Sequence, residues 1–409
     1  MIKVNRLRGE NRSISEEEFY ERVGSLTYCA SEPFSEKRID LLNRLSRVFL
    51  TSVNSRLNPQ ITALGFWLRK SSIKKIRNDF LNRQPENTIL SARGIAFHLP
   101  PANVDTLFVY SWALAFLTGN VNIVRMPETP SEIATYLVGA ILEVLNDTEE
   151  KDNHIFCSYD YKNEVNARLS GLSDLRMIWG GDAKVELISR SPMRADGVSL
   201  GFPDRYSYSL ISEKEFVRLD GPIKKDLIEK FYNDLYWFDQ MGCGSPRILY
   251  WQGQDNKAIL EFEKMLSNHA TDKGYNPDTN IVFNKFVFLN EMLANNNAML
   301  GKVHSNALHT LEADINTDLR NGSPGGGLLT IVKVPSIMDI TSFAKRKDQT
   351  ITHFGFTKEE ITLFAKSIRG KGGYRIVPIG QALDFGPIWD GIDLLSDMTR
   401  KIVLMVNAE

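Results

Sequence analysis

Cys243 stands in a setting that suits a reactive thiol. The stretch "FDQMGCGSP" at 238–246 places it between Gly242 and Gly244, with Pro246 close behind. Glycine neighbours leave the sulfur uncrowded and permit turns closed to other residues, and the proline ends the loop. If the loop presents backbone N–H groups to the sulfur, the pKa of the thiol falls below its ordinary value of about 8.5. We therefore expect Cys243 to be a nucleophile, although small buried cysteines are commoner.

The other two of the chain's 3 cysteines lack such a setting. Cys157 lies in the apolar run "HIFCSYD" and is expected in a core, and nothing in the sequence suggests a role for Cys29. The cysteines are scattered and form no CxxC pair, so we expect neither a disulfide framework nor a zinc site. No HExxH-type motif occurs, so we expect no metal.

Asn103 is the second candidate for chemistry. The stretch "PPANVD" opens a helix predicted over 104–118 that ends at Gly119, and Asn103 stands at its N-cap position. A side-chain amide at that place can also donate to a developing oxyanion, and removing one such donor typically costs about 3 kcal/mol of barrier. The two roles are compatible.

A glycine pair, Gly180 and Gly181, follows a strand predicted over 174–179 and precedes a helix. This order aims backbone N–H groups at a phosphate. Glycine pairs often only turn the chain, so both interpretations stay open. Asp182 would repel a close phosphate and is expected to cap the helix.

Other polar and glycine-rich features have two interpretations each. The triplet Gly325–Gly327 predicts either a flexible lip over a ligand or a tight loop before a strand. His98 is either a core histidine or the base that ionises the thiol, and His353 is expected within a strand. The basic run at 69–84 is either a solvated helix face or a dock for a phosphate-bearing substrate or acidic carrier protein.

Aromatic residues near the candidate elements are open to two interpretations as well. They either line a tunnel for an acyl chain or pack in the core. They are Phe108, Trp112, Trp237 and Phe238.

These candidates need elements to position them, and the pattern supplies an α/β order. Residues 1–90 are predicted mainly helical, and from about 91 strands alternate with helices, which is typical of a parallel sheet covered on both faces. The stretch "GVSLGFPDRYSYSLI" at 197–211 is predicted as one strand-like segment.

Composition excludes several classes of function. The 409 residues carry 49 Lys and Arg against 50 Asp and Glu, so no overall field would attract nucleic acid or an anionic membrane. With 43% apolar and 24% charged residues the chain is expected to be globular. The apolar run at 107–117 is shorter than the about 20 residues a membrane span needs, and the first residues form no apolar signal region. We expect a cytoplasmic protein with no membrane span.

Three segments of the sequence resemble the aldehyde dehydrogenase superfamily, and among its members the bacterial long-chain acyl-CoA reductases of luminescence. The segments are "PPANVDTLFVYSWALAFLTGNVNIVRMPE" at 100–128, "FDQMGCGSPRILY" at 238–250 and "GGYRIVPIGQALDFGPIWDGIDLLSDMTR" at 372–400. The resemblance implies two Rossmann-like domains, one for a cofactor and one catalytic, with a helical N-terminal region and a small oligomerisation element.

Roles for single residues follow from this resemblance. It implies that Cys243 accepts the acyl group and that Asn103 shares an oxyanion hole with the Cys243 backbone N–H. Arg125, followed by Pro127, stands where the superfamily usually has a lysine that touches the adenosine ribose. A cation there suits the extra phosphate of NADPH, which we expect in preference to NADH. Gly180 and Gly181 match the superfamily's nucleotide-binding turn.

Two positions depart from the superfamily's pattern. Ser199 in "VSLGFP" stands where oxidising members carry a glutamate that activates water, and "SPGGG" at 323–327 replaces the block whose glutamate holds the nicotinamide ribose. Losing the water-activating base suits an enzyme that exchanges acyl groups with a thiol.

The resemblance thus implies NADPH-dependent reduction of an acyl-CoA, expected to be fatty, to an aldehyde through a Cys243 acyl-enzyme. The alternatives are an acyl-phosphate reductase of the same fold and a catalytically silent scaffold that binds an acyl-transferring partner. Expected partners are the acyl-CoA, an acyl-activating or acyl-transferring protein and further copies of the chain.

Four parts are expected along the chain. They are a helical region at 1–90 packed on the cofactor domain, an NADP-binding domain at 91–215, a catalytic domain at 216–370 with the nucleophile, and a segment at 371–409 that returns to the cofactor domain or an oligomer interface.

Overall fold

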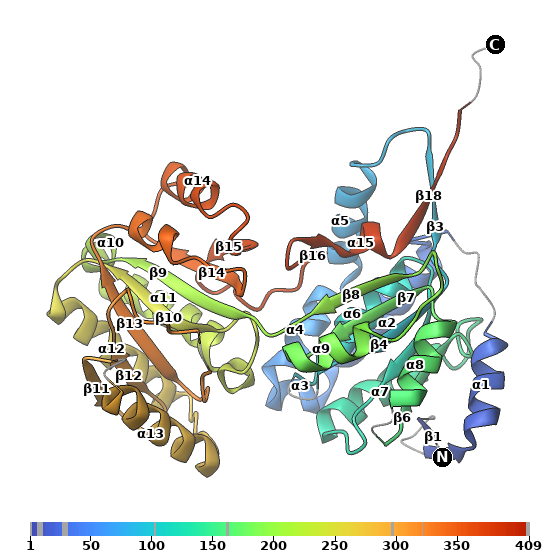
Figure 1. Cartoon of the computed structure of the whole chain (residues 1–409), viewed down its shortest axis with the longest axis horizontal. Coiled ribbons are helices and arrows are strands. Elements are labelled where there is room, and N and C mark those ends of the chain that lie inside the picture. The colour runs from blue at the N-terminus through green and yellow to red at the C-terminus, as the bar shows by residue number, and fades with distance from the viewer. Residues whose placement is uncertain are drawn as a thin grey trace. The chain divides into compact units, whose positions relative to one another are not determined.

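The computed structural model describes residues 2–5, 11–26, 32–101, 104–160, 163–295, 298–320 and 322–405. The chain forms two compact units (Figure 1). Unit 1 comprises Met1–Pro203 with Phe385–Glu409, and unit 2 comprises Asp204–Asp384. The predictions for Cys29 and Asn103 concern positions outside the described residues.

Unit 1 is built on a 7-stranded sheet in the order β2-β1-β6-β5-β4-β7-β8. The strands from β6 to β8 are parallel, whereas β1 and β2 add an antiparallel edge. Five of the described helices lie between Glu16 and Leu81, which agrees with the prediction of a mainly helical N-terminal region; the sequence analysis did not predict the two strands of this edge. The strands are β1 (Ile2–Asn5), β2 (Asn11–Ile14), β4 (Ile95–Leu99), β5 (Val121–Arg125), β6 (His154–Ser158), β7 (Leu175–Trp179) and β8 (Val198–Phe202).

Helices cover both faces of this sheet because successive strand residues point to opposite sides. Ala96 belongs to one hydrophobic cluster and its neighbour Phe97 to the other. The first cluster includes α2 (Glu36–Thr51), α4 (Pro59–Trp67), α5 (Lys70–Leu81), α6 (Leu107–Leu117) and α7 (Glu132–Leu145). The second includes α1 (Glu16–Gly24), α8 (Asn163–Leu172) and α9 (Asp182–Ser189).

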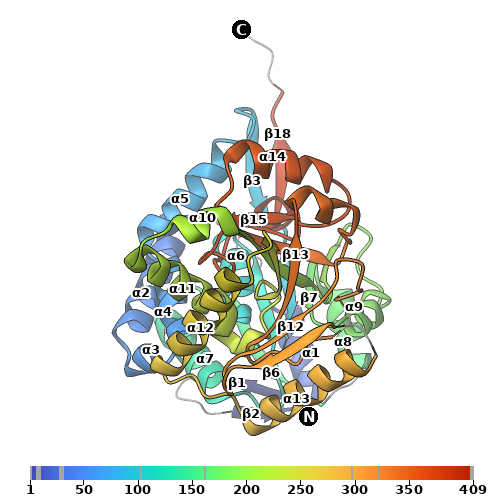
Figure 2. The same cartoon turned by 90° about the vertical axis from the view of Figure 1, so that its left-hand side faces the viewer.

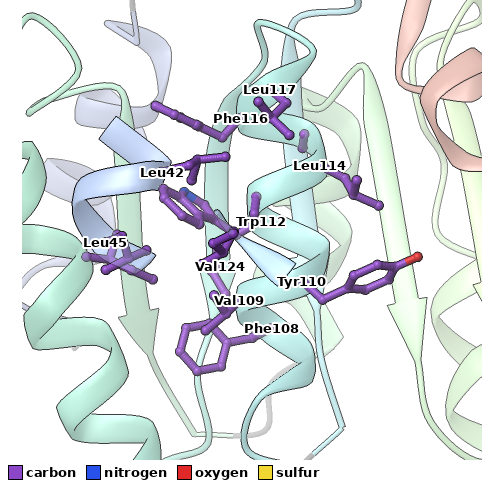
Figure 3. Close-up of a cluster of buried hydrophobic side chains, with 14 of the residues drawn as sticks. Leu42, Leu45, Phe108, Val109, Tyr110, Trp112, Leu114, Phe116, Leu117 and Val124 are labelled. Atoms are coloured by element: carbon purple, nitrogen blue, oxygen red, sulfur yellow. The ribbon is translucent and has the colours of Figure 1, made fainter. Parts of the chain in front are cut away.

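Helix α6 forms the centre of the first cluster, as Figure 3 shows. All of its residues are buried, and Trp112 stacks on Phe116 with ring centroids 5.1 Å apart. Phe108 and Trp112 therefore pack in the core and do not line a tunnel. The helix begins at Leu107, after Thr106 as N-cap, which is later than the predicted start at 104.

The basic run at 69–84 contains the whole of α5, and acidic residues of α2 neutralise part of its charge. Glu36 lies within 3.5 Å of Lys70, 3.3 Å of Lys74 and 2.9 Å of Arg77, and Lys70 also pairs with Asp40. These ion pairs support the interpretation of a solvated helix face and weaken that of a dock for an acidic carrier.

Unit 2 has a second 7-stranded sheet, in the order β11-β12-β13-β10-β9-β14-β15. Neighbouring strands are parallel except for β11 and β12. The strands are β9 (Tyr206–Ser212), β10 (Pro246–Gln252), β11 (Leu300–Val303), β12 (His309–Glu312), β13 (Leu328–Val334), β14 (Asp348–Phe354) and β15 (Arg375–Pro378).

Two hydrophobic clusters again cover the two faces of the sheet. One includes α10 (Glu213–Arg218), α11 (Gly221–Tyr236) and α12 (Asn256–Asp272), seen near β13 in Figure 2. The other includes the 3-10 helix η3 (Ile337–Ser342) and α14 (Lys358–Ser367). Helix α13 (Thr279–Ala294) packs beside β11.

The boundary between the units differs from the predicted boundaries at 215/216 and 370/371. The stretch at 197–211 is two strands, β8 and β9, in different sheets, and the chain leaves unit 1 between them. Pro203 lies at this break, and a proline has no N–H to continue a ladder. The chain returns to unit 1 at Phe385.

A two-stranded antiparallel ribbon joins β3 (Thr88–Ala92) to β18 (Thr399–Val403). Several apolar side chains on and after it are exposed: Ile89, Ile402, Val403, Leu404 and Met405. The same part of unit 1 holds β16 (Ile388–Trp389), β17 (Ile392–Asp393) and α15 (Leu394–Asp397).

Candidate active site

Cys243 lies in the loop between the 3-10 helix η2 (Trp237–Gln240) and β10, at the amino-terminal edge of the unit 2 sheet. Cys243 is half-buried, whereas both of its glycine neighbours are buried. The Ser207 hydroxyl donates to the Cys243 carbonyl over 2.6 Å, and the Ser245 N–H donates to the Gly242 carbonyl over 3.0 Å. The backbone of the loop is therefore fixed while its cysteine keeps access to solvent.

The two flanking glycines are needed for close packing. Neither has a positive φ, contrary to the prediction of a turn closed to other residues. A Cβ on Gly244 would lie 2.5 Å from the Ala382 carbonyl oxygen, and one on Gly242 would lie 3.3 Å from Leu383. The loop thus rests directly on residues 382–383.

The segment before the loop has a rare backbone conformation. Phe238, Asp239 and Gln240 have φ values of 55°, 51° and 62°. Left-handed backbone costs an L-residue roughly 1–2 kcal/mol. The Asp239 carbonyl accepts the Gly326 N–H over 2.7 Å, and the Tyr275 hydroxyl donates to the Asp239 carboxylate over 2.8 Å. Neighbouring contacts therefore hold the strained turn in place.

The Gln240 side chain joins this turn to two strands. Its amide nitrogen donates to the carbonyls of Pro246 and Leu328, both over 2.8 Å, and its oxygen accepts the Gly327 N–H over 3.0 Å. Gln240 is fully buried. One side chain thereby ties the nucleophile loop to the first residues of β10 and β13.

The glycine triplet is a tight buried turn and not a flexible lip. Gly325, Gly326 and Gly327 have φ values of 71°, 61° and 82°. A Cβ on Gly325 would lie 2.5 Å from the Asp239 carbonyl oxygen, so only glycine permits this approach. The Lys285 ammonium donates to the Gly326 carbonyl over 2.6 Å, and burial lowers its pKa to about 8.

In unit 1 the predicted glycine turn follows β7 and opens α9. Gly181 is the N-cap of α9, and Asp182, predicted to cap it, is instead the first helical residue. A Cβ on Gly180 would lie 2.8 Å from Cδ of Lys184, so the lysine stem crosses the glycine closely.

This turn borders the place where the strand order of the sheet reverses. The chain starts the parallel part at β4, places β5 and β6 on one side of it, and then places β7 and β8 on the other. In such sheets, ligands bind at the carboxyl ends of the two central strands, here β4 and β7.

Lys184, which the sequence analysis missed, bridges these two strand ends. Its ammonium donates to the Pro100 carbonyl over 3.0 Å and to the Trp179 carbonyl over 2.9 Å. Burial, and then the nearby charge of Arg125, lower its pKa to about 8. A lysine one turn after a glycine pair was the available signal, but its two partners are remote in sequence.

Arg125 ends β5 at the same edge, and Pro127 follows it. Its guanidinium lies 5.0 Å from the ring centroid of Tyr159 and donates to the Tyr159 carbonyl over 3.4 Å. The structure therefore brings all four predicted cofactor residues of unit 1 to one sheet edge: Arg125, Pro127, Gly180 and Gly181.

Residues 72–401 match the model of a protein family described as acyl-CoA reductase (LuxC). The chain belongs to this family. This confirms the predicted resemblance to acyl-CoA reductases.

Relatives of this LuxC family member agree with the assignment. This chain is 25% identical over 182 residues to the long-chain acyl-protein thioester reductase of Aliivibrio fischeri, and the match covers 44% of this chain and 36% of that protein. The chain thus matches only about a third of the length of that relative.

Solved aldehyde dehydrogenase structures share the fold of this LuxC family member. The NADP complex of glyceraldehyde-3-phosphate dehydrogenase from Methanocaldococcus jannaschii has a TM-score of 0.66 at 14% identity, covering 98% of this chain and 97% of that one. Methylmalonate-semialdehyde dehydrogenase from Oceanimonas doudoroffii has a TM-score of 0.70 at 10% identity, with coverages of 98% and 94%. The predicted aldehyde dehydrogenase-like fold is confirmed.

His98 is a core residue of this LuxC family member. Its Nδ1 lies 2.7 Å from the Ser111 hydroxyl and its Nε2 lies 2.8 Å from the Asn122 side-chain oxygen. Burial lowers the pKa of His98 to about 4, so the imidazole is neutral at neutral pH. The structure supports the core interpretation and not that of a base for the thiol.

Ser199 lies in β8, where its hydroxyl accepts a hydrogen bond from Arg176 Nε over 3.1 Å. His353 is a half-buried residue of β14, as predicted. Asn103 lies outside the described residues, so its place in an oxyanion hole stays a prediction.

Two features are absent from the described ranges of the LuxC family member. Within them, no three His, Cys, Asp or Glu side chains are grouped to hold a metal ion. Among the helices in those ranges, none is both long and apolar enough to cross a bilayer.

Proposed function

We propose that this protein reduces a fatty acyl-CoA thioester to an aldehyde with NADPH, through an acyl group held on Cys243. One observation carries the proposal. The chain is a member of the acyl-CoA reductase family, and its Cys243 is half-buried in a loop. This loop is held in place by hydrogen bonds and by close packing. The relative from Aliivibrio fischeri is described as a long-chain acyl-protein thioester reductase, which favours a fatty acyl substrate.

The chemistry of the first half-reaction follows from the thiol. The Cys243 thiolate attacks the thioester carbonyl, the oxyanion collapses, and the carbon–sulfur bond to CoA breaks to leave an acyl-enzyme. Asn103 and the Cys243 backbone N–H are the proposed oxyanion donors. Ser199 cannot activate water as a glutamate would, which protects the acyl-enzyme from hydrolysis.

The residues at the carboxyl edge of the unit 1 sheet fit a dinucleotide. Lys184 and Arg125 supply two cations, Gly181 is the N-cap of α9, whose amino-terminal end attracts phosphate, and Gly180 lets the Lys184 stem pass close to the turn. We propose that these residues and Pro127 hold NADPH. When bound, its nicotinamide supplies the hydride that reduces the acyl group. The related glyceraldehyde-3-phosphate dehydrogenase was solved with NADP, which favours a nicotinamide cofactor here.

The experiment is to incubate the protein with radiolabelled acyl-CoA, quench it, and measure label that hydroxylamine releases. We expect such label on the wild type and on Cys157→Ala, because Cys157 is fully buried, and none on Cys243→Ala. Label that persists on Cys243→Ala would rule out the assigned nucleophile. CoA release during turnover separates this activity from reduction of an acyl phosphate, and no labelling by any acyl-CoA would favour a silent scaffold.

The ribbon of β3 and β18 is the proposed contact with a second copy of the chain. An isolated two-stranded sheet is marginally stable in water, and this one exposes Ile89, Ile402 and Val403. An oligomer that covers these side chains and pairs the edge strands would bury the exposed apolar surface and stabilise the ribbon.

A further inference from the structure

We propose that Asp234 is a positioning residue for the nucleophile loop and acts through the backbone segment 380–383. The inference rests on the proposed role of Cys243. It assigns a function to a buried carboxylate of α11 that binds the backbone of Gly380 and Ala382 and that the reaction itself does not require.

Both oxygens of Asp234 bind one short backbone segment. Oδ2 accepts the Gly380 N–H over 2.7 Å, and Oδ1 accepts the Ala382 N–H over 2.9 Å. The Asp234 side chain is 1% exposed. Burying a carboxylate is costly unless it is hydrogen-bonded, so packing α11 on the sheet does not by itself account for an aspartate at this position.

Arg375 holds the same segment through the opposite backbone groups. Its guanidinium donates to the Gln381 carbonyl over 2.6 Å and to the Ala382 carbonyl over 2.7 Å. The carboxylate therefore fixes the N–H groups and the guanidinium fixes the C=O groups. A segment without helix or strand hydrogen bonds is thereby given one defined position.

This segment is the surface on which the nucleophile loop rests. The Ala382 carbonyl oxygen would lie 2.5 Å from a Cβ on Gly244, and Leu383 would lie 3.3 Å from a Cβ on Gly242. Both glycines adjoin Cys243. A shift of the segment by a few tenths of an ångström would therefore move the loop, because close-packed interiors transmit strain.

Protonation of Asp234 near neutral pH is expected to weaken its hold on the segment 380–383. Burial raises the pKa of Asp234 to about 7, against the two N–H bonds that lower it. Asp384 raises this pKa further, and Arg375 lowers it. Lys230 of the same helix packs its stem within 2.9 Å of a Cβ on Gly380, and it pairs with Asp226. A proton on Asp234 weakens one of the two acceptors.

The test compares Asp234→Asn with Asp226→Asn, an exposed carboxylate on the same helix. Three quantities are measured: the alkylation rate of Cys243 by iodoacetamide, by peptide mass spectrometry; the rate of Cys243 acylation by acyl-CoA; and the Kd of NADPH. We expect Asp234→Asn to slow acylation by up to about 100-fold, the cost of misplacing a reacting group by about 1 Å. Asp234 belongs to unit 2 and the proposed NADPH residues belong to unit 1, so the Kd of NADPH should change less than about twofold, which corresponds to about 0.4 kcal/mol. Asp226→Asn should match the wild type in all three quantities.

The pH profile separates positioning from a merely structural role. In the wild type, the alkylation rate of Cys243 should show a titration near pH 7 besides that of the thiol. Asp234→Asn should lack this step, and the control variant should keep it. An Asp234→Asn protein that is folded by circular dichroism and has wild-type acylation rates and an unchanged profile overturns the proposal.

A second variant decides the matter if Asp234→Asn fails to fold. Leu383→Ala keeps both anchors of the segment but removes its side-chain contact with the loop glycines. We expect slower alkylation and acylation of Cys243, and unchanged rates would overturn the proposal. Alkylation needs no substrate, so it tests the positioning role of Asp234 even if the wild type accepts no acyl group. A wild type that accepts no acyl group would refute the proposed function instead.

Discussion

Cys157 and Cys243 carry the same thiol in different surroundings. Cys157 lies in β6, and burial raises its pKa to about 12, so it stays protonated and inert. Cys243 is half-buried in a loop flanked by glycines. The sequence predicted this contrast from the neighbours of each cysteine. It could not predict why the glycines are needed, because Ala382 and Leu383, which they touch, are remote in sequence.

Replacing Gly244 with alanine should slow acylation of Cys243. The added Cβ would lie 2.5 Å from the Ala382 carbonyl oxygen, so the loop must move. We expect a loss of about 10- to 100-fold in the acylation rate, measured by rapid quench. Gly221→Ala is the matched control, since a Cβ there meets nothing within 4 Å. Equal rates for both variants would contradict the packing argument.

Replacing Lys184 with methionine should weaken NADPH binding. A hydrogen bond to a charged group contributes about 1.5–3 kcal/mol, so we expect the Kd, measured by NADPH fluorescence, to rise at least about tenfold. Lys184→Arg should retain much of the affinity, and the exposed Lys151→Met should match the wild type. An unchanged Kd in Lys184→Met would remove this residue from the cofactor site.

Replacing Arg125 with alanine should reduce the preference for NADPH over NADH. If Arg125→Ala does not alter this preference, Arg125 does not bind the extra phosphate.

At the scale of elements, alternating apolar patterns predicted the parallel sheets and the helices on both faces. They did not predict β1 and β2, because strands of 4 residues are too short to show periodicity and because β1 pairs with the distant β6. The stretch at 197–211 looked continuous because strands of both sheets share one apolar pattern. The Ser131 hydroxyl accepts the Ala134 N–H and so caps α7, and an N-cap of this kind is a signal carried by adjacent residues.

The strained turn before the nucleophile loop should depend on Gln240. Leucine at this position would leave the Gly327 N–H and the carbonyls of Pro246 and Leu328 without their partner. We expect the free energy of unfolding, from urea titration, to fall by about 2–4 kcal/mol, since leaving a buried group unsatisfied costs about 1–3 kcal/mol. Leucine at the exposed Gln254 is the control. A fall in the free energy of unfolding below about 0.5 kcal/mol, which is typical of surface changes, would show that the hydrogen bonds of Gln240 are not needed.

Asp234 should make unit 2 less stable as pH rises. Burial raises its pKa to about 7, so between about pH 4, its unfolded value, and pH 7 the folded protein keeps a proton that the unfolded chain has lost. The free energy of unfolding therefore falls as pH rises through this window. Urea titrations from pH 4 to 7 should show a shallower fall for Asp234→Asn than for Asp226→Asn. Parallel curves for the two variants would contradict the shifted pKa.

At the scale of the whole molecule, each unit contributes one half of the proposed chemistry. Unit 2 holds the nucleophile at the amino edge of its sheet, and unit 1 holds the glycine turn at the carboxyl edge of its own. The sequence predicted both halves and the aldehyde dehydrogenase-like fold. The sequence did not predict the role of Lys184, because its partners are remote in sequence: Trp179 is the last residue of β7, and Pro100 follows the end of β4.

The ribbon of β3 and β18 should control assembly. Lysine in place of Ile402 puts a charge on the exposed apolar edge, which natural edge strands use against pairing. We expect the mass of the particle, measured by light scattering, to fall from that of an oligomer toward 46.4 kDa. Lys401→Arg on the same strand is the control. A wild type that is already a monomer, or an Ile402→Lys protein of unchanged mass, would refute the ribbon's role.

The most direct test of the central claim is a single turnover followed by intact-protein and peptide mass spectrometry. The protein is mixed with an acyl-CoA in the absence of NADPH, and NADPH is then added. The account predicts a mass increase of one acyl group on the peptide that carries Cys243, lost after NADPH is added as aldehyde appears in equal amount. Aldehyde formed without any acyl group on Cys243, or an acyl group that NADPH does not discharge, would contradict it.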